Sequence, residues 1–240
     1  MITQEQSVGE VAAISLGAVR VFENHGIDYC CGGKRPLGDV CREQNVDFAT
    51  LQQQLETATR DNGAPVKDWA KEPLRDLIHH IVTTHHEYLK LEMPRINDRM
   101  NKVLNAHGDK DPERLAELAK TYGGLYAELD QHMHKEEMVL FPAIERYEAV
   151  VSQRLPAPPL PFGTFQNPVA MMEMEHDNAG EALRRIKELT NNYELPDYAC
   201  PTYRALYQGF EEMESDLHQH IHLENNILFP RSIELEKVNA

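Results

Sequence analysis

The sequence predicts an all-α protein in which a small N-terminal helical domain precedes a four-helix bundle. Three observations lead to this prediction. Apolar residues recur at helical spacing along most of the 240 residues. Almost no segment alternates between apolar and polar residues with period two, as a half-buried strand would. Four long helical segments follow one another in the C-terminal part of the chain, and stretches containing proline and glycine separate them.

Residues 1–58 are expected to form a domain of short helices. The segment SVGE at Ser7–Glu10 matches a capping box, in which the serine hydroxyl and the glutamate carboxylate each accept a hydrogen bond from a backbone N–H group. The stretch HGIDYCCGGKRP, which starts at His25, is expected to be a loop because it contains three glycines and a proline. Pro36 then suits the first turn of a helix, and Asp47 suits the cap of another.

Residues 59–72 are expected to link this domain to a bundle formed by residues 73–240. The first bundle helix contains Pro94, where we expect a bend. The proline-rich stretch RLPAPPLPFGTFQNP forms a long connection between the second and third helices. Such a middle connection is typical of two αα-hairpins packed as one bundle. The four helices are expected at residues 73–105, 112–147, 168–191 and 201–230.

Composition argues against several classes of partner and location. The chain has 39 acidic and 24 basic residues, a formal net charge of −15 and no stripe of lysine and arginine, so nucleic acid is not an expected partner. No run of about 18 apolar residues is present, so we expect no membrane partner. The start lacks the features of a signal peptide, and four irregularly spaced cysteines do not form a disulfide scaffold. We therefore expect a cytoplasmic protein.

One segment of the chain occurs twice, as QHMHKEEMVLFP from Gln131 and as QHIHLENNILFP from Gln219. Residues four apart lie on one face of a helix, so each copy presents a column of an acid, a histidine, a glutamate and a leucine. Such polar groups on a core-facing stripe are costly to bury unless they meet a partner, and a metal ion suits imidazole and carboxylate together. The columns are Glu128, His132, Glu136 and Leu140, and Asp216, His220, Glu224 and Leu228.

The other two bundle helices carry the remaining candidate ligands. The third helix contains His176, and the first contains His85 and His86. An acid follows both His86 and His176, which favours His86, but both adjacent histidines lie on plausible inward stripes and the spacing leaves the choice open. Four histidines and two glutamates suit two metal ions that the glutamates bridge. The absence of cysteine from the set favours iron or manganese over structural zinc.

A ferritin-like site is the alternative arrangement of such a centre. It needs a Glu-x-x-His pair on each of two helices. Glu173 and His176 provide one pair, and the repeated segment provides no second one. The ferritin-like arrangement is therefore the weaker interpretation.

These motifs resemble those of the bacterial di-iron iron–sulfur cluster repair proteins, in which a short N-terminal domain precedes a hemerythrin-like four-helix bundle. The stretch DYCCGGK is similar to the N-terminal signature of that family, and HMHKEEMVLFP, EHDNAGE and HIHLENNILFP are similar to its metal motifs. The resemblance covers nearly the whole chain. It implies two iron ions per chain in an oxo- or hydroxo-bridged non-haem centre, with the glutamates as bridges. The implied ligands are His86, His132, Glu136, His176, His220 and Glu224.

One position differs from the oxygen-carrying hemerythrins. Those proteins use a second histidine four residues after the one on the third helix, and this chain has Gly180 there. The fourth helix also spaces its carboxylate differently. One histidine fewer should leave an exchangeable coordination position, which suits redox chemistry or release of iron better than reversible oxygen storage.

Cys30 and Cys31 form a second candidate site for redox or transfer chemistry. Adjacent cysteines close only a strained disulfide ring, so a structural bridge is not expected. The pair lies in a glycine loop before a helix start, near Lys34 and Arg35, and this setting should lower a thiol pKa. The alternative is two small, half-buried residues. The remaining cysteines, Cys41 and Cys200, are expected to be packing residues.

Other acids and histidines receive weaker assignments. Glu128 and Asp216 lie one turn before a candidate ligand, and Glu175 directly precedes His176, so these three acids are candidates for orienting ligands or lining a proton or iron path. The alternative is that they are solvated acids. The other histidines are expected behind the ligands or on the outer face (His134, His222), or at the surface or its boundary (His79, His80, His107, His218).

The resemblance implies a stress-response protein that repairs iron–sulfur clusters damaged by nitrosative or oxidative stress. It would act by supplying iron, by removing nitric oxide, or by both. Its partners would be damaged iron–sulfur proteins, nitric oxide as a small-molecule ligand and an electron donor, and the chain would act as a monomer or homodimer. The alternatives are an enzyme that reduces nitric oxide at the same centre, a hemerythrin-like protein that binds oxygen or metal, and a purely structural bundle.

Overall fold

The computed structural model describes residues 2–60 and 68–239. These residues form helices and contain no β-strand, which confirms the predicted all-α class. Within the described chain one isolated backbone bridge pairs Ser7 with Pro36. The predicted linker, residues 59–72, falls partly on residues 61–67, which lie outside the described residues.

The chain divides into two compact units. The first unit contains Met1–His79, Ile144–Asn167 and His218–Ala240, and the second contains His80–Ala143 and Pro168–Leu217. Each unit is described by itself.

The N-terminal part of the first unit consists of four short helices. The predicted capping box is present: the Glu10 N–H donates to the Ser7 hydroxyl (3.2 Å), and the Ser7 N–H donates to the Glu10 carboxylate (2.8 Å). Asp47 caps the fourth helix, as predicted, by accepting a hydrogen bond from the Thr50 N–H (2.8 Å). Pro36 is the residue before the third helix and does not lie in its first turn. The helices are α1 (Val8–Ala12), α2 (Leu16–Asn24), α3 (Leu37–Gln44) and α4 (Phe48–Arg60).

These short helices enclose an apolar core of their own. Val8, Phe22 and Leu51 are completely buried in it, and Cys41 also packs there, as the sequence predicts. Ile221, from the C-terminal part of the same unit, joins this core. Burying each such aliphatic or aromatic side chain contributes about 1.5–3 kcal/mol, so this contact helps to hold the N-terminal helices in place.

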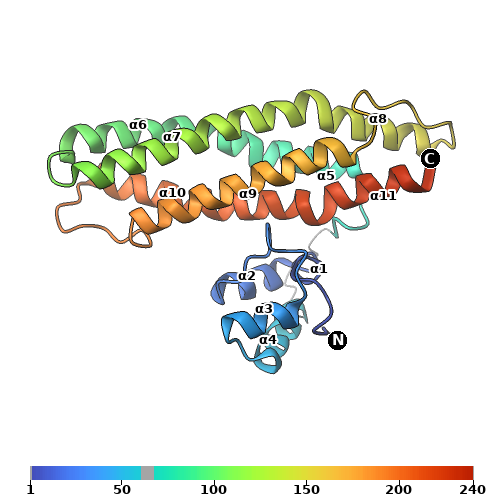
Figure 1. Cartoon of the computed structure of the whole chain (residues 1–240), viewed down its shortest axis with the longest axis horizontal. Coiled ribbons are helices and arrows are strands. Elements are labelled where there is room, and N and C mark those ends of the chain that lie inside the picture. The colour runs from blue at the N-terminus through green and yellow to red at the C-terminus, as the bar shows by residue number, and fades with distance from the viewer. Residues whose placement is uncertain (1, 61–67, 240) are drawn as a thin grey trace. The chain divides into compact units, whose positions relative to one another are not determined.

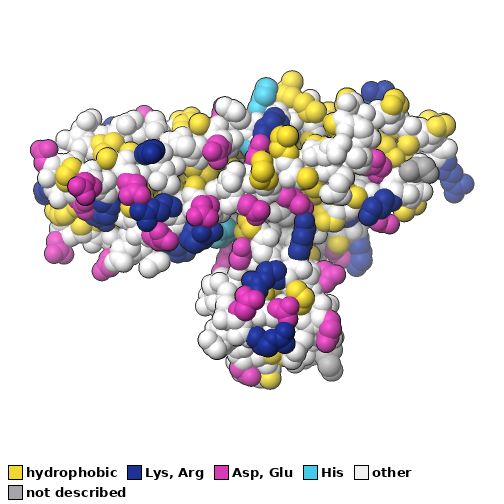
Figure 2. Space-filling view, in the orientation of Figure 1, with side chains coloured by type: hydrophobic (Ala, Val, Ile, Leu, Met, Phe, Trp, Pro, Cys, Tyr) yellow, Lys and Arg dark blue, Asp and Glu magenta, His cyan; other side chains and the backbone are white. Residues whose placement is uncertain are grey.

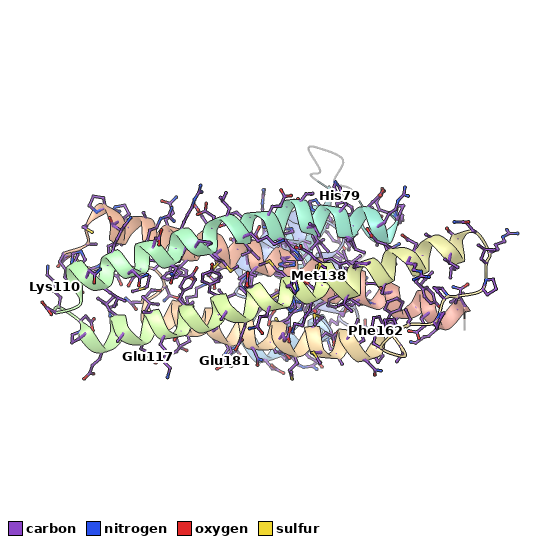
Figure 3. The ribbon with its side chains drawn as sticks, turned by 90° about the horizontal axis from the view of Figure 1, so that it is seen from above. His79, Lys110, Glu117, Met138, Phe162 and Glu181 are labelled. Carbon is purple, nitrogen blue, oxygen red and sulfur yellow. The ribbon has the colours of Figure 1, made fainter. Side chains whose placement is uncertain are left out.

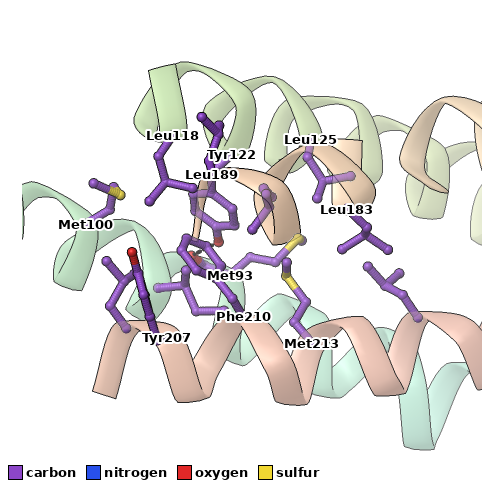
Figure 4. Close-up of a cluster of buried hydrophobic side chains, with 14 of the residues drawn as sticks. Met93, Met100, Leu118, Tyr122, Leu125, Leu183, Leu189, Tyr207, Phe210 and Met213 are labelled. Atoms are coloured by element: carbon purple, nitrogen blue, oxygen red, sulfur yellow. Dashed lines mark hydrogen bonds between the residues drawn. The ribbon is translucent and has the colours of Figure 1, made fainter. Parts of the chain in front are cut away.

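The second unit is a helical bundle in which four long helices run alongside one another (Figure 1). Figure 4 shows how their side chains meet in the interior, among them Tyr122 and Phe210, whose ring centroids lie 5.2 Å apart. The Tyr122 hydroxyl donates to the carbonyl of Met93 (2.6 Å), which gives this buried phenol its partner. The first helix continues through Pro94. The four helices are α6 (Glu87–His107), α7 (Pro112–Lys135), α9 (Gln166–Leu189) and α10 (Pro201–Leu223).

Three one-turn π-helices occur within the long helical segments of the described part of the chain. In each of them a backbone N–H reaches back five residues: Glu87 to Val82, Phe141 to Glu136, and Phe229 to Glu224. Such wide turns are rare, and they are frequent at functional sites. They are η1 (Val82–His86), which follows α5 (Leu74–Ile81), η2 (Glu136–Leu140), which precedes α8 (Phe141–Ser152), and η3 (Glu224–Leu228), which precedes α11 (Phe229–Asn239).

The prediction that the last helix ends near Pro230 is wrong, because α11 continues to Asn239. The physical reason is the π-turn before it. A wide turn adds one residue to the helix and leaves one backbone N–H out of register with its acceptor, so a proline, which has no N–H, costs little at that point. Pro142 occupies the same place after η2.

Charged side chains cover the surface without forming a basic patch on the face shown. In Figure 2 lysine and arginine side chains lie among aspartate and glutamate side chains. Figure 3 shows Lys110 at the turn between α6 and α7, and Glu117 and Glu181 on the outer sides of α7 and α9. No helix among residues 2–60 and 68–239 has the length and apolar character needed to cross a membrane.

Candidate metal centre

Four of the predicted metal ligands come together in the second unit. The Nε2 atoms of His132 and His176 lie 3.1 Å apart. A carboxylate oxygen of Glu136 lies 3.4 Å from the Nε2 of His86 and 3.4 Å from the Nε2 of His132. All four side chains are at most 3% exposed. Three helical segments therefore direct imidazole nitrogens toward one buried carboxylate.

Two carboxylates behind this group set the tautomers of its histidines. The Nδ1 of His86 donates to Glu137 (2.7 Å), and the Nδ1 of His132 donates to Glu175 (2.9 Å). Because an ionised carboxylate only accepts hydrogen bonds, the proton of each neutral ring lies on Nδ1. The lone pair of each Nε2 then faces the interior, as a metal ligand requires.

Lysine side chains keep these two carboxylates ionised. Lys90 donates to both oxygens of Glu137 (2.6 and 2.8 Å), and Lys135 donates to Glu175. Burial acts to raise the pKa of each glutamate, but the hydrogen bonds from lysine and histidine outweigh it, so both pKa values lie below the usual value for glutamate. Each carboxylate therefore remains an acceptor at neutral pH.

The other two predicted ligands lie together in the first unit. The Nε2 of His220 lies 3.0 Å from a carboxylate oxygen of Glu224, and the two residues are 1% and 0% exposed. Glu224 begins η3, and Glu136 begins η2, so each copy of the repeated segment places its glutamate at the start of a π-turn.

The six residues form two groups whose ligand atoms lie within 4.8 Å of one another. Glu136 and Glu224 belong to both groups, and each group adds two histidines. Nitrogen and carboxylate oxygen donors without sulfur suit iron, manganese or zinc. The donor set therefore fits metal ions. The groups are His86, Glu136, His220 and Glu224, and His132, Glu136, His176 and Glu224.

The three other predicted acids differ in their surroundings. Glu175 accepts a hydrogen bond from the Nδ1 of His132. Asp216 accepts a hydrogen bond from the Nδ1 of His85 (2.9 Å), so this buried histidine faces α10 and does not belong to either group. Glu128 is exposed on α7.

Sequence reasoning missed Glu137. Two features of the sequence could have indicated this residue: it is an acid directly after Glu136, and Lys90 lies four residues after His86. The two residues after the second glutamate were missed as well. Asn225 and Asn226 stand where the first copy has Glu137 and Met138. This difference indicates that the two copies make different contacts beside their glutamates.

The two asparagines hold the loop that contains Cys30. Asn226 donates to the carbonyl of Tyr29 (3.0 Å), and Asn225 donates to the carbonyl of Cys30 (3.4 Å). A Cβ on Gly33 would lie 2.4 Å from the Asn226 side-chain oxygen, so the close approach requires glycine. All these residues belong to the first unit.

His222 lies beneath the same loop. Of the two expected places, behind the ligands or on the outer face, the outer face is wrong for His222, because its ring is 5% exposed and meets the edge of Tyr29 with a centroid separation of 5.6 Å. Its Nδ1 lies 3.0 Å from the Asn226 amide. Burial lowers the pKa of His222 to about 4, so the ring is neutral. By contrast, His134 is exposed on α7. His107 at the end of α6 is buried, contrary to the expectation that it lies at the surface or its boundary.

The cysteine pair lies close to Asp28. Their Sγ atoms are 3.8 Å apart, which is too far for a disulfide bond. One Asp28 oxygen accepts from the backbone N–H of Cys30 and of Cys31 (3.0 Å each). The hydrogen bond with the Cys31 thiol, burial and the Asp28 charge raise the pKa of Cys30. The expected lowering is therefore wrong for Cys30: Arg35 pairs with Glu43 (2.5 Å), and Asp28 is the charge beside the thiol.

The fold and the buried histidine and glutamate set define a hemerythrin-like protein. A family model described as the hemerythrin HHE cation binding domain matches residues 77–232. A second model, ScdA_N, a domain of unknown function, matches residues 4–59.

Relatives with known names match nearly the whole chain. The iron-sulfur cluster repair protein YtfE of Yersinia pseudotuberculosis (serotype O:1b, strain IP 31758) is 38% identical over 230 residues, which cover 96% of this chain and 97% of the relative. The protein of the same name from Yersinia pestis (strain Pestoides F) has the same identity and coverage. This chain belongs to the iron–sulfur cluster repair protein family, with a hemerythrin HHE cation binding domain.

Proposed function

We propose that this chain holds two iron ions in an oxo- or hydroxo-bridged centre. His86 and His220 would bind one ion, His132 and His176 the other, and Glu136 and Glu224 would bridge them. The observation that supports this most directly is the presence of both glutamates in both groups of ligand atoms. When bound, such a centre supplies electrons and exchangeable iron.

The chain's own residues prepare this site in three ways. The hydrogen bonds from His86 to Glu137 and from His132 to Glu175 fix the ring orientations before any ion binds. The buried surroundings exclude water from the ligands. The position four residues after His176 is Gly180, which offers no ligand atom, so a bound centre would keep a position for a small molecule or for exchange of the ion.

We propose that the protein repairs iron–sulfur clusters damaged by nitrosative or oxidative stress. It would supply iron to damaged iron–sulfur proteins, remove nitric oxide, or do both, with electrons from a donor protein in the cytoplasm. The relatives are named for iron–sulfur cluster repair, and this supports the proposal. Cys30 and Cys31 would take part in transfer, because the asparagines directly after the bridging Glu224 hold their loop.

The proposed organisation is a domain at residues 1–58, a linker at 59–72 and a di-iron bundle at 73–240. The family matches at residues 4–59 and 77–232 support these boundaries. The chain would act as a monomer or homodimer.

The test combines metal analysis with repair. Wild-type protein is expected to hold about two irons per chain, with a Mössbauer spectrum of an antiferromagnetically coupled pair, and to restore activity to a hydratase whose cluster has been damaged by nitric oxide. The variant Glu136→Leu/Glu224→Leu should lose both properties. Glu181→Gln changes an exposed residue on α9 and is the matched control, so it should keep both the iron and the repair activity. A wild-type protein that contains one zinc ion, or repair that persists in the iron-free variant, would refute the proposal.

Reduction of nitric oxide at the same centre is the second candidate. Gly180 favours it over reversible oxygen storage, because one histidine ligand fewer leaves room for a small molecule. Repeated consumption of nitric oxide by the reduced protein, with formation of nitrous oxide, would identify an enzyme. Repair of the hydratase without such turnover would identify an iron donor, and a stable reversible oxygen complex would identify a carrier.

A further inference from the structure

The cysteine loop of the first unit brings three metal-binding side chains together. One ligand atom from each of Asp28, Cys30 and Cys31 lies within 4.8 Å of the other two. All three residues belong to the first unit, and none of them is a member of the two histidine and glutamate groups. Two sulfurs and one oxygen form a softer donor set than imidazoles and carboxylates, so the loop is a candidate metal site in its own right.

The separations between these atoms are close to those in a tetrahedral thiolate site. The Sγ atoms of Cys30 and Cys31 are 3.8 Å apart, and the Cys30 Sγ lies 3.3 Å from a carboxylate oxygen of Asp28. Metal–sulfur bonds of about 2.3 Å place two sulfurs on one tetrahedral ion about 3.8 Å apart, and a carboxylate oxygen about 3.6 Å from each sulfur. One cation could therefore bind all three atoms after small movements of the side chains.

Hydrogen bonds hold the loop that carries the three side chains. One Asp28 oxygen accepts from the backbone N–H groups of Cys30 and Cys31 (3.0 Å each), and Asn226 donates to the Tyr29 carbonyl (3.0 Å). An ionised carboxylate has about four positions at which it accepts, so these contacts leave Asp28 able to bind a cation. The ligands are thus positioned before an ion binds, which lowers the entropic cost of binding.

Negative charge at the loop would be offset by a cation. The hydrogen bond with Cys31, burial and the Asp28 charge raise the pKa of Cys30, because a thiolate is unfavourable beside other acidic groups. Arg35, which lies near the loop in sequence, pairs with Glu43 (2.5 Å). When a divalent cation binds, each thiol releases its proton to the solvent, and the positive charge of the ion replaces those protons.

The loop leaves one side of such an ion accessible. The Cys30 side chain is buried, whereas Cys31 is half-buried and Asp28 is exposed. Structural zinc sites are closed by four protein ligands, and three protein ligands with an open fourth position are found where a metal exchanges ligands. The arrangement therefore favours an ion that can be passed on over a structural ion.

We propose that Asp28, Cys30 and Cys31 form a mononuclear site for a divalent transition-metal cation that accepts tetrahedral thiolate coordination, such as zinc or ferrous iron. The two thiolates and one carboxylate oxygen bind the ion, and water or a ligand from another protein takes the fourth position. A role of this site in transfer rests on the proposed function, whereas binding of the ion does not depend on the di-iron centre.

The test is a titration of the whole chain with cobalt(II), after reduction of its thiols and under anaerobic conditions. A bond from cobalt(II) to a thiolate gives an intense absorption band in the near ultraviolet, which histidine and carboxylate ligands do not give. Wild-type protein and Glu136→Leu/Glu224→Leu should both show this band, with about one such cobalt ion per chain. Absence of the band from both proteins at saturating cobalt would overturn the proposal, whatever the iron content of the wild-type protein.

Three variants test the ligands. Cys30→Ser and Cys31→Ser should each remove about half of the band or more and weaken binding, because each removes one thiolate. Asp28→Asn should keep the band at saturation but bind cobalt about tenfold more weakly or worse, since loss of a group that only orients a ligand already costs about 10–100-fold. The asparagine oxygen can still accept from the two backbone N–H groups, so the loop should keep its conformation.

Matched controls remove the same groups elsewhere. Cys200→Ser removes a thiol from the second unit, and Asp39→Asn removes an exposed carboxylate of the first unit that pairs with Arg42, so both should keep the wild-type band and affinity. A band that persists unchanged in Cys30→Ser and Cys31→Ser would contradict the proposed ligands. Circular dichroism verifies the fold of each variant, and the wild-type spectrum tests the site even if a variant does not fold.

Competition tests the class of ion. Zinc should displace cobalt and abolish the band, and ferrous iron should do so only in excess, because its affinity for a given set of ligands is lower. Magnesium prefers oxygen ligands and should leave the band unchanged. Retention of the band in the presence of excess zinc, or its loss with magnesium, would contradict a thiolate site for such cations.

Discussion

Replacement of Glu137 by glutamine should weaken metal binding without removing a ligand. Glu137 accepts the Nδ1 proton of His86 at 2.7 Å and pairs with Lys90 at 2.6 and 2.8 Å. Glutamine has the same shape but no charge, and its amide can present a donor to the ring. The tautomer of His86 that directs the Nε2 lone pair inward would then lose its support.

The expected magnitude follows from the contact that is lost. A hydrogen bond to a charged group contributes about 1.5–3 kcal/mol, and the Glu137 side chain is 26% exposed, which places the effect toward the lower end. This corresponds to a decrease in metal affinity of about tenfold, within the range of about 10–100-fold for loss of a group that orients a histidine ligand. Glu175→Gln should act similarly through His132, at 2.9 Å.

The assay is competition for ferrous iron with a chelator of known affinity, under anaerobic conditions. Glu137→Gln and Glu175→Gln are compared with Glu181→Gln, which removes the same charge from an exposed position paired only with Arg184 among the contacts described. If affinities of the first two variants remain within twofold of the control, the carboxylates do not prepare the histidines for metal, and the reasoning from tautomers is refuted.

Three further predictions concern the loop and the bundle. Asn226→Ala removes the hydrogen bond to the Tyr29 carbonyl, worth about 1 kcal/mol, and alkylation of Cys30 should become several-fold faster, whereas an unchanged rate would show that the amide does not hold the loop. Gly124→Ala should raise the free energy of unfolding by about 0.5–1 kcal/mol in chemical denaturation, because nothing lies within 4 Å of the added methyl group on this helix, and a decrease would contradict the open surroundings. Phe210→Ala should lower the same free energy by about 3–5 kcal/mol, and a loss below 1 kcal/mol would mean that the core collapses around the gap.

The helical class and the candidate ligands could be predicted from the sequence because both predictions depend on the spacing of residues that lie close together in the chain. The columns of the repeated segment need only the four-residue period of a helix, and the structure indeed places His132 near Glu136 and His220 near Glu224. The same period could not separate His85 from His86. The π-turn at Val82–His86 widens the helix there and buries both residues, so no single inward stripe distinguishes them.

The contacts that the sequence did not predict join residues far apart in the chain. Asn225 and Cys30 are 195 positions apart, and no local pattern relates them. The tautomer of His86 likewise depends on Glu137, 51 positions away, on a different helix. The pKa of Cys30 was misjudged for a different reason, because the Asp28 carboxylate two residues before it contacts the thiol, whereas Arg35 pairs with Glu43.

The two copies of the repeated segment differ at the residue after the glutamate, and there they make different contacts. Directly after its buried glutamate the first copy has Glu137, which holds the ring of His86, and the second copy has Asn225, which holds the carbonyl of Cys30. An asparagine amide suits a carbonyl because it can donate, whereas a carboxylate would only repel it. The two repeated pairs of candidate ligands therefore have different supporting residues. Glu137 orients a histidine of the candidate metal centre, and the asparagines keep the cysteine loop against the π-turn that begins at Glu224.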